Sequence, residues 1–220
     1  MNIVLGIAVA SLLVAGATAA HAASVKGNFE KPGNTPAAMT YGPTLPPAGY
    51  VAFCGRGEDE CRFSGGADER LSLTNATWSE INKVNKYVNT KIRPATDMEL
   101  YGVADYWTYP VDAGDCEDYV LLKKRYFEQL GYKADELLIT VVLDENGDGH
   151  AVLTIPTDKG DLILDNRRQD ILRWNETGYT YLKRQAQSAS NQWLSLQRGP
   201  TAPVATSIVT TGAKPSTDSN

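Results

Sequence analysis

The central part of the chain shows a helical pattern of apolar residues. From Trp78 to Ile92 these residues recur at steps of three and four, which puts them on one face of an α-helix. Thr74 precedes the run and is a favoured N-cap residue, and Pro94 follows it, where a helix ends. We therefore predict a helix between these two residues. Its apolar face comprises Trp78, Ile81, Val84, Val88 and Ile92.

A second helix is predicted from about Cys116 to Leu130, with Gly131 at the C-cap position. Its apolar residues include Val120 and Phe127, which are available to a core. Acidic residues crowd its first turn, where the positive end of the helix dipole favours them. They are Asp115, Glu117 and Asp118.

Three strands are predicted after this helix. Residues 137–143 form a continuous apolar and β-branched run, and similar runs follow at 150–155 and 161–165. Turn residues separate the runs, the second turn being Pro156 to Gly160. Helices that precede an antiparallel meander predict an α+β domain.

The first of these turns, residues 144–149, also matches the opening of an EF-hand calcium loop. That loop needs a bidentate glutamate at its twelfth position, which is Ile155 here. We therefore interpret the segment as a hairpin turn, with a metal loop as the weaker alternative.

The N-terminus has the pattern of a secretory signal. An uncharged apolar stretch from Ile3 to Val14 is followed by Ala20-His21-Ala22, which fits the A-x-A cleavage pattern. We predict that residues 1–22 are removed; an uncleaved anchor helix is the alternative, because no Lys or Arg marks the start.

Residues rich in Ala, Gly, Pro, Ser and Thr flank the predicted elements. We interpret residues 23–49 as a flexible lead-in and residues 199–220 as a disordered tail, because such compositions bury little apolar surface. The folded domain is predicted to comprise residues 50–198.

The composition fits a soluble globular domain and excludes collagen-like, coiled-coil and wholly disordered classes. The 220 residues are 42% hydrophobic and 21% charged, with a net charge of −5. Runs of Lys and Arg are short, the longest being Lys123-Lys124-Arg125, so we expect no nucleic-acid partner. We also expect no transmembrane segment after signal cleavage.

The three cysteines divide into a pair and a single thiol. Cys54 and Cys61 are seven residues apart across a polar, glycine-containing segment, and in an exported protein we expect them to form a disulfide. A zinc site is the weaker alternative, because too few further ligands are present. Cys116 is left as an odd thiol. Once His21 is removed, His150 is the only imidazole that can pair with it.

Cys116, His150 and Asp165 form a candidate catalytic set. The predicted helix N-terminus favours a thiolate at Cys116 and supplies a backbone donor for an oxyanion. Antiparallel pairing of the last two predicted strands makes His150 and Asp165 diagonal neighbours about 7–8 Å apart, within reach of an Asp–imidazole hydrogen bond. The sulfur would then be the nucleophile, the imidazole the proton carrier, and the carboxylate its orienting group. Each residue taken alone has a plain structural role as the alternative.

These residues and their surroundings resemble the bacterial transglutaminase-like cysteine peptidases, including the LapG-like periplasmic proteases. The resemblance covers about residues 50–198. It is carried by Gly114-Asp115-Cys116-Glu117-Asp118-Tyr119, Gly131-Tyr132, Gly149-His150-Ala151-Val152-Leu153, Leu164-Asp165-Asn166, Trp107, Pro110, Gly178-Tyr179 and Trp193.

The resemblance implies a papain-like or transglutaminase-like fold and a periplasmic or secreted cysteine peptidase with Cys116, His150 and Asp165 as its triad. It implies calcium ligands at Asp115 and Glu117, although these acids also complement the helix dipole. A surface adhesin as the protein substrate and an inner-membrane receptor for cyclic-di-GMP as a regulator follow from the same relatives. A second oxyanion donor is unassigned, with Trp107 a candidate.

Three other functions remain open at this point. An NlpC/P60-like cell-wall amidase also has a cysteine at a helix N-terminus and a histidine on a following strand, but the acidic pair after Cys116 and the aspartate fit the peptidases better. A true transglutaminase would transfer the acyl group to an amine. A catalytically silent binding module would have an inert Cys116 with an ordinary thiol pKa of about 8.5.

Overall fold

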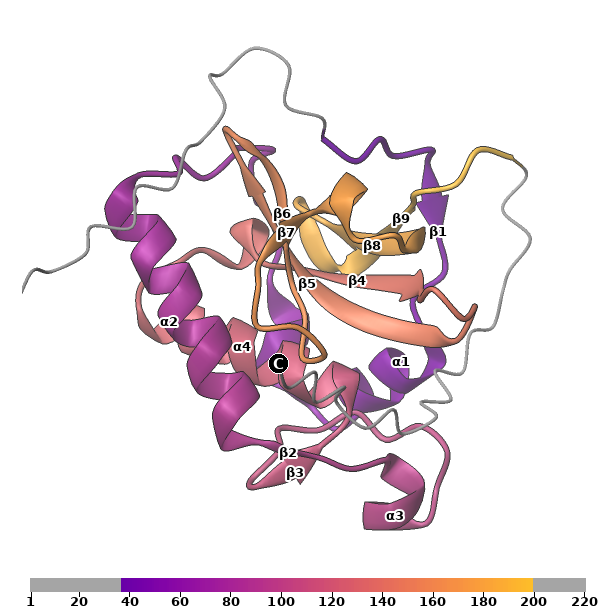
Figure 1. Ribbon diagram of the computed structural model, residues 1–220. Coiled ribbons are helices and arrows are strands. Elements are labelled where there is room, and N and C mark those ends of the chain that lie inside the picture. Colours follow the sequence, from indigo (N-terminus) through magenta and orange to yellow (C-terminus); the bar gives the residue numbers. More distant parts are fainter. Residues whose placement is uncertain (1–36, 200–220) are drawn as a thin grey trace, which may run out of the picture.

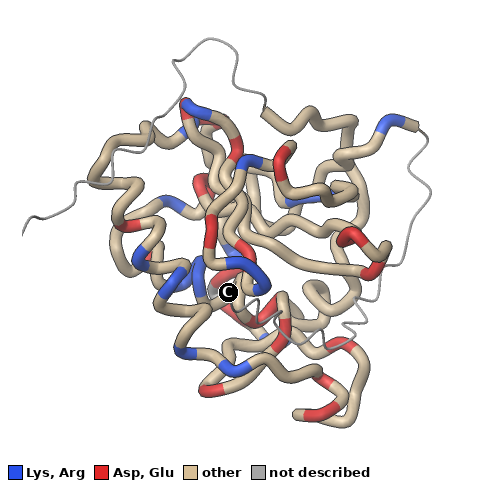
Figure 2. The backbone as a smooth tube through the Cα atoms, in the orientation of Figure 1, with Lys and Arg blue, Asp and Glu red and all other residues tan. Residues whose placement is uncertain are grey.

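A computed structural model describes residues 37–199 (Figure 1). The predicted signal peptide (1–22), the first part of the lead-in (23–36) and residues 200–220 of the predicted tail lie outside the described residues. Among residues 37–199, no helix is long and apolar enough to span a bilayer. Basic and acidic positions are interspersed along the described chain (Figure 2).

One mixed-length antiparallel sheet organises the domain, in the strand order β1-β9-β8-β4-β5-β6-β7. The predicted strands are its centre, β4-β5-β6, and the α+β prediction is confirmed. Two short strands, β2 (Arg93–Pro94) and β3 (Ala113–Gly114), pair in parallel elsewhere. The strands of the large sheet are β1 (Pro43–Thr44), β4 (Leu138–Leu143), β5 (Gly149–Thr157), β6 (Gly160–Leu164), β7 (Leu172–Arg173), β8 (Thr180–Ala186) and β9 (Ala189–Ser195).

Helices α2 and α4 form a layer against this sheet, with α4 packed on β5 and α2 packed on α4 (Figure 1). Both were predicted. The helices are α1 (Ala48–Gly55), α2 (Asn75–Lys91), α3 (Asp97–Tyr101) and α4 (Cys116–Gln129). Short 3₁₀ turns are η1 (Asp59–Arg62), η2 (Ala134–Glu136) and η3 (Trp174–Glu176).

The predicted apolar face of α2 is the face that packs against α4. Ile81, Val84 and Val88 are buried in the main core, together with the α4 residues Val120 and Phe127. This packing fixes α4 against the sheet, and α4 carries Cys116 at its first residue.

Thr74 caps α2 as predicted. Its hydroxyl accepts a hydrogen bond from the Thr77 N–H at 3.2 Å, and the Thr77 hydroxyl accepts one from the Thr74 N–H at 2.8 Å. We expect Thr74→Ala to lower the free energy of unfolding by about 1 kcal/mol, because the Thr77 N–H at the helix start loses its ordered acceptor. Urea denaturation measures this loss, and an unchanged midpoint would contradict it.

The prediction of a flexible lead-in over residues 23–49 is wrong for its described part, residues 37–49, which is bonded to the folded domain. Strand β1 pairs with β9, the Tyr41 N–H donates to Ser195 O at 2.8 Å, and the Ala38 N–H donates to the buried Asp161 Oδ2 at 2.8 Å. These long-range backbone bonds satisfy polar groups that a composition argument leaves to water. The folded unit therefore begins before residue 50.

The two connections of the central meander are tight turns. Residues 144–149 form the β4–β5 hairpin turn, as we interpreted them, with the Asp144 Oδ1 accepting the N–H groups of Asn146 and Asp148 at 2.8 and 2.9 Å. The turn predicted from Pro156 to Gly160 is shorter, because β5 continues to Thr157, which pairs with Gly160.

The predicted disulfide is present. Cys54 at the end of α1 is bonded to Cys61 in η1, and Cys116 is buried and takes no part in a disulfide. The bridge fixes the polar loop between the two helical segments.

Candidate active site

Cys116 lies at the first turn of α4, facing β5. Its side chain is buried, and its sulfur accepts the Ala151 N–H at 3.3 Å and donates to Glu117 Oε2 at 3.0 Å. Asp115 is the N-cap residue. The free N–H groups of a helix N-terminus favour negative charge at this sulfur. The contact with Ala151 brings the sulfur to the strand at the residue next to His150.

His150 and Asp165 are joined by a hydrogen bond. The distance from His150 Nε2 to Asp165 Oδ1 is 2.9 Å. It forms because Leu153 pairs with Leu164, the predicted register, and Asp165 directly follows β6. The ring is fully buried, and its Nδ1 makes no hydrogen bond within the described part of the chain. One imidazole nitrogen is thus oriented by a carboxylate, and the other remains available.

Asp165 is held ionised by several donors. Although burial disfavours its charge, hydrogen bonds from His150, from the Tyr179 hydroxyl to Oδ2 (2.6 Å) and from the Arg167 N–H to Oδ1 (2.9 Å) keep the pKa of Asp165 well below its usual range. Tyr179 also packs edge-on against the His150 ring, with the centroids 5.7 Å apart. The carboxylate is therefore charged and fixed at neutral pH.

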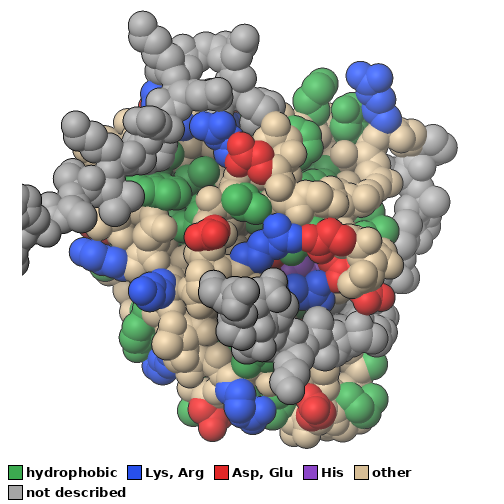
Figure 3. Space-filling view, in the orientation of Figure 1, with side chains coloured by type: hydrophobic (Ala, Val, Ile, Leu, Met, Phe, Trp, Pro, Cys, Tyr) green, Lys and Arg blue, Asp and Glu red, His purple; other side chains and the backbone are tan. Residues whose placement is uncertain are grey.

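The loop that carries Asp165 is anchored on two sides. From α2, Asn89 Nδ2 donates to the carbonyls of Asp165 and Arg168 at 2.7 and 3.0 Å. From the β4–β5 hairpin, Asp144 and Glu145 form ion pairs with Arg167 and Arg168. Basic and acidic side chains accordingly border the histidine in the space-filling view (Figure 3).

An acidic cluster lies on the other side of Cys116. One ligand atom from each of Asp97, Asp115 and Glu117 lies within 4.8 Å of the others, and all three residues are buried. One oxygen of each accepts no hydrogen bond from a described residue: Asp97 Oδ1, Asp115 Oδ1 and Glu117 Oε1. Three buried carboxylates with free oxygens are the donor set that a hard divalent cation such as calcium prefers.

The cluster resists ionisation because its members are buried and repel one another. Burial, with repulsion from Asp105, raises the pKa of Asp97 to about 6, and burial with repulsion from Asp97 raises that of Asp115 to about 7. Burial and then Asp115 raise the pKa of Glu117 well above its usual value. Burial, with repulsion from Asp115, raises the pKa of neighbouring Asp118 to about 8. The cluster therefore needs protons or a cation.

Two residues of the site were not assigned from the sequence. Asp97 joins the predicted pair Asp115 and Glu117, and no local spacing signals it, because it reaches them from α3. Tyr179 was noted in the resemblance without a role. Trp107, the candidate second oxyanion donor, is a core residue stacked edge-on with Tyr50 at 5.6 Å, and that role stays untested.

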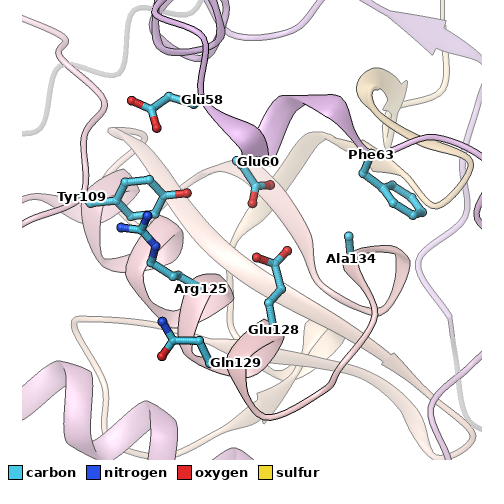
Figure 4. A pocket seen from close by; sticks show the side chains of 8 residues that line it. All are labelled: Glu58, Glu60, Phe63, Tyr109, Arg125, Glu128, Gln129 and Ala134. Atoms are coloured by element: carbon cyan, nitrogen blue, oxygen red, sulfur yellow. The ribbon is translucent and has the colours of Figure 1, made fainter.

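A separate pocket of about 410 Å³ contains none of these residues. Figure 4 shows Glu60 and Glu128 facing each other across it. Lys124 lies 3.4 Å from an oxygen of each, and Arg125 stacks over the Tyr109 ring at 3.9 Å. Burial raises the pKa of Glu60 to about 7. Lys124 thus offsets the charge of both glutamates.

The family profile of the bacterial transglutaminase-like cysteine proteinases (BTLCP) matches residues 40–200. The chain belongs to this family. It is a cysteine peptidase with a transglutaminase-like α+β fold, as the resemblance implied. A search of curated proteins finds no match.

Solved structures of one BTLCP-like protease are similar to the chain. Calcium-bound LapG of Legionella pneumophila is 28% identical, with a TM-score of 0.47, over 56% of this chain and 71% of that one. A second LapG structure from the same organism is 27% identical, with a TM-score of 0.43, over 49% of this chain and 63% of that one. An EGTA-treated form of LapG is also 27% identical, with a TM-score of 0.43, over 49% of this chain and 62% of that one.

Proposed function

We propose that this cysteine peptidase uses Cys116 as nucleophile, His150 as proton carrier and Asp165 as orienting carboxylate, and that it hydrolyses peptide bonds of a protein substrate. One observation carries the proposal. The sulfur at the start of α4 contacts the residue next to His150, whose imidazole is hydrogen bonded to Asp165 at 2.9 Å. This arrangement fits nucleophilic catalysis by an activated thiol.

The reaction begins when the thiol proton passes to His150 Nδ1 and the sulfur bonds to the substrate carbonyl carbon. The π electron pair of the carbonyl moves to its oxygen, near the N–H groups at the start of α4. When that pair returns, the C–N bond breaks and the amine leaves with the proton from His150. Water, deprotonated by His150, then hydrolyses the thioester and restores the thiol.

We propose further that Asp97, Asp115 and Glu117 hold a calcium ion. The bound ion supplies the positive charge that the buried cluster lacks. Its consequence for catalysis lies at Glu117, whose carboxylate contacts the nucleophile at 3.0 Å. An ionised, unbalanced Glu117 would oppose a thiolate at this distance, so its neutralisation favours the reactive form of Cys116.

The acidic cluster predicts an unusual pH dependence of stability. Asp97 and Asp115, with pKa values raised to about 6 and about 7, bind protons more tightly in the folded chain than in the unfolded one. Their contribution to stability is present below pH 4 and is lost as the pH rises through 6 and 7. In EGTA we therefore expect the melting temperature to fall between pH 5 and pH 7, and calcium to restore it.

Thermal unfolding at these two pH values, with EGTA and with calcium chloride, measures the effect. Asp115→Asn is expected to flatten the pH dependence and to weaken the calcium effect, whereas Glu80→Gln, at a distant surface position, changes neither. A melting temperature that rises with pH in EGTA, or that ignores calcium, would contradict the proposed site.

Export and a surface-protein substrate complete the proposal. The disulfide Cys54–Cys61 suits an oxidising compartment, in agreement with the signal pattern at the N-terminus. A surface adhesin is the substrate that we propose, and control by an inner-membrane receptor stays a prediction.

Three substrates distinguish this function from its alternatives. The enzyme with calcium is incubated with a library of synthetic peptides, with peptides plus a fluorescent primary amine, and with purified peptidoglycan. We expect new peptide termini in the first, no amine incorporation in the second and no release of stem peptides in the third. Incorporation of the amine would replace hydrolysis by acyl transfer, and released stem peptides would favour the cell-wall amidase.

A further inference from the structure

Arg167 is fixed at the junction between the Asp165 loop and the β4–β5 hairpin. Its backbone N–H donates to Asp165 Oδ1 at 2.9 Å, and its Nη1 forms an ion pair with Asp144 Oδ2. Asp144 is itself immobilised, because its other oxygen accepts two N–H groups of the hairpin turn. The guanidinium is therefore held in place by a carboxylate that cannot easily move.

This guanidinium also lies within the electrostatic reach of the nucleophile. Burial disfavours its charge, but the hydrogen bond to Asp144 and the attraction of Cys116 and Asp165 raise the pKa of Arg167. Its side chain is 20% exposed, against 1% for Asp144. Within the described residues, only Nη1 of the guanidinium makes a hydrogen bond. A fixed cation with remaining N–H donors thus lies beside the hydrogen-bonded pair Asp165–His150 and opens to solvent, and the charge of Cys116 attracts it.

We propose that Arg167 is a further catalytic residue, whose guanidinium stabilises the negative charge that passes from the Cys116 sulfur to the carbonyl oxygen of a bound peptide. The inference rests on the proposed function of Cys116. In the attack described above, the sulfur bonds to the carbonyl carbon and the π pair moves to oxygen. Donors that are oriented before the reaction stabilise this charge without reorganising. Arg167 would then supply donors beside the helix N–H groups.

Arg168 provides a matched control. It is the next arginine in the chain and pairs with the next acid of the same hairpin, Glu145. Its side chain is more exposed, at 35%, and its guanidinium lies 5.3 Å from the centroid of the Tyr179 ring. Both arginines tie the loop to the hairpin, but the guanidinium of Arg168 lies over Tyr179, whereas that of Arg167 is attracted by Cys116.

The test compares an anionic and a neutral alkylating reagent on the full chain at fixed pH with saturating calcium. Iodoacetate and iodoacetamide react with the same sulfur, and a cation beside it accelerates the anionic reagent selectively. We expect Arg167→Gln to lower the iodoacetate-to-iodoacetamide rate ratio at Cys116 about tenfold. Arg168→Gln should change it less than about twofold, and Arg167→Lys should retain most of it because the charge remains.

Peptide cleavage by the same variants completes the test. We expect kcat/KM of Arg167→Gln to fall about 100-fold, mainly through kcat, as when one oxyanion donor is removed. A purely structural Arg167 would lower the melting temperature and slow both reagents equally, leaving the ratio unchanged. An unchanged ratio, or equal losses in Arg168→Gln, would overturn the inference.

A measurement on the wild type makes the result independent of variant folding. Raising the ionic strength should slow iodoacetate and leave iodoacetamide unaffected, because salt screens the guanidinium; the absence of this difference also contradicts the inference. Failure here is distinguishable from failure of the proposed function. If Cys116→Ala still cleaves peptides, the proposed function fails, whereas full activity of Arg167→Gln in an enzyme that needs Cys116 removes only the role of Arg167.

Discussion

Cys116→Ala is expected to reduce peptide cleavage about a millionfold, to below detection, while the domain stays folded. The sulfur is the atom that bonds to the carbonyl carbon, and the two other cysteines of the described chain are joined in a disulfide and do not replace it. Cleavage of the peptide library, followed by mass spectrometry, measures the loss.

The fold of this variant is checked by its melting temperature and by calcium binding. Cys116 is buried in the main core, but it contributes only a small side chain, so the substitution leaves the packing of α4 on β5 largely intact. Cys116→Ser, which keeps the size and a hydroxyl, is a second inactive variant in the same state. Cleavage by either variant at the wild-type rate would show that another group performs the chemistry.

His150→Ala is expected to reduce kcat/KM about ten-thousandfold, the second largest effect. The imidazole is the group that accepts the thiol proton and returns it to the leaving amine. Iodoacetamide labelling of Cys116 should be rapid below pH 7 in the wild type. In the variant the labelling rate should rise only as the pH approaches the pKa of an ordinary thiol, about 8.5.

Asp165→Asn is the matched control for the histidine. An asparagine oxygen can still accept the Nε2–H bond that measures 2.9 Å in the structure, and cysteine enzymes with Cys-His-Asn triads use this arrangement. We therefore expect a smaller loss than in His150→Ala. Equal iodoacetamide profiles in the wild type and in His150→Ala would contradict the pairing of Cys116 with His150.

Much of the fold was predictable because its central elements carry strong local patterns. The apolar spacing and caps of α2, the first turn of α4 and the β-branched runs of the meander all depend on residues close in sequence. Strands β8 and β9 were missed. Their buried polar residues, including Lys183, Arg184 and Gln185, break the apolar run that identifies a strand. Strand β1 was missed because two residues give no period.

The site residues were likewise predictable where local sequence positions them, and not where distant loops do. The bond between His150 and Asp165 followed from strand register, and the position of Cys116 followed from the helix start. Asp97 and Arg167 depend instead on loops that return from distant elements: α3 brings one to Asp115, and the β4–β5 hairpin fixes the other through Asp144. A single sequence carries no periodic signal for such contacts.

The acyl-enzyme itself offers the most direct test. Wild-type protein with calcium is mixed with the best-cleaved library peptide, quenched in acid within milliseconds to seconds, digested and examined by mass spectrometry. The account predicts an adduct on the segment that contains Cys116, with the mass of the N-terminal product less water, that hydroxylamine removes. Peptide cleavage without this adduct, together with undiminished cleavage by Cys116→Ala, would contradict it.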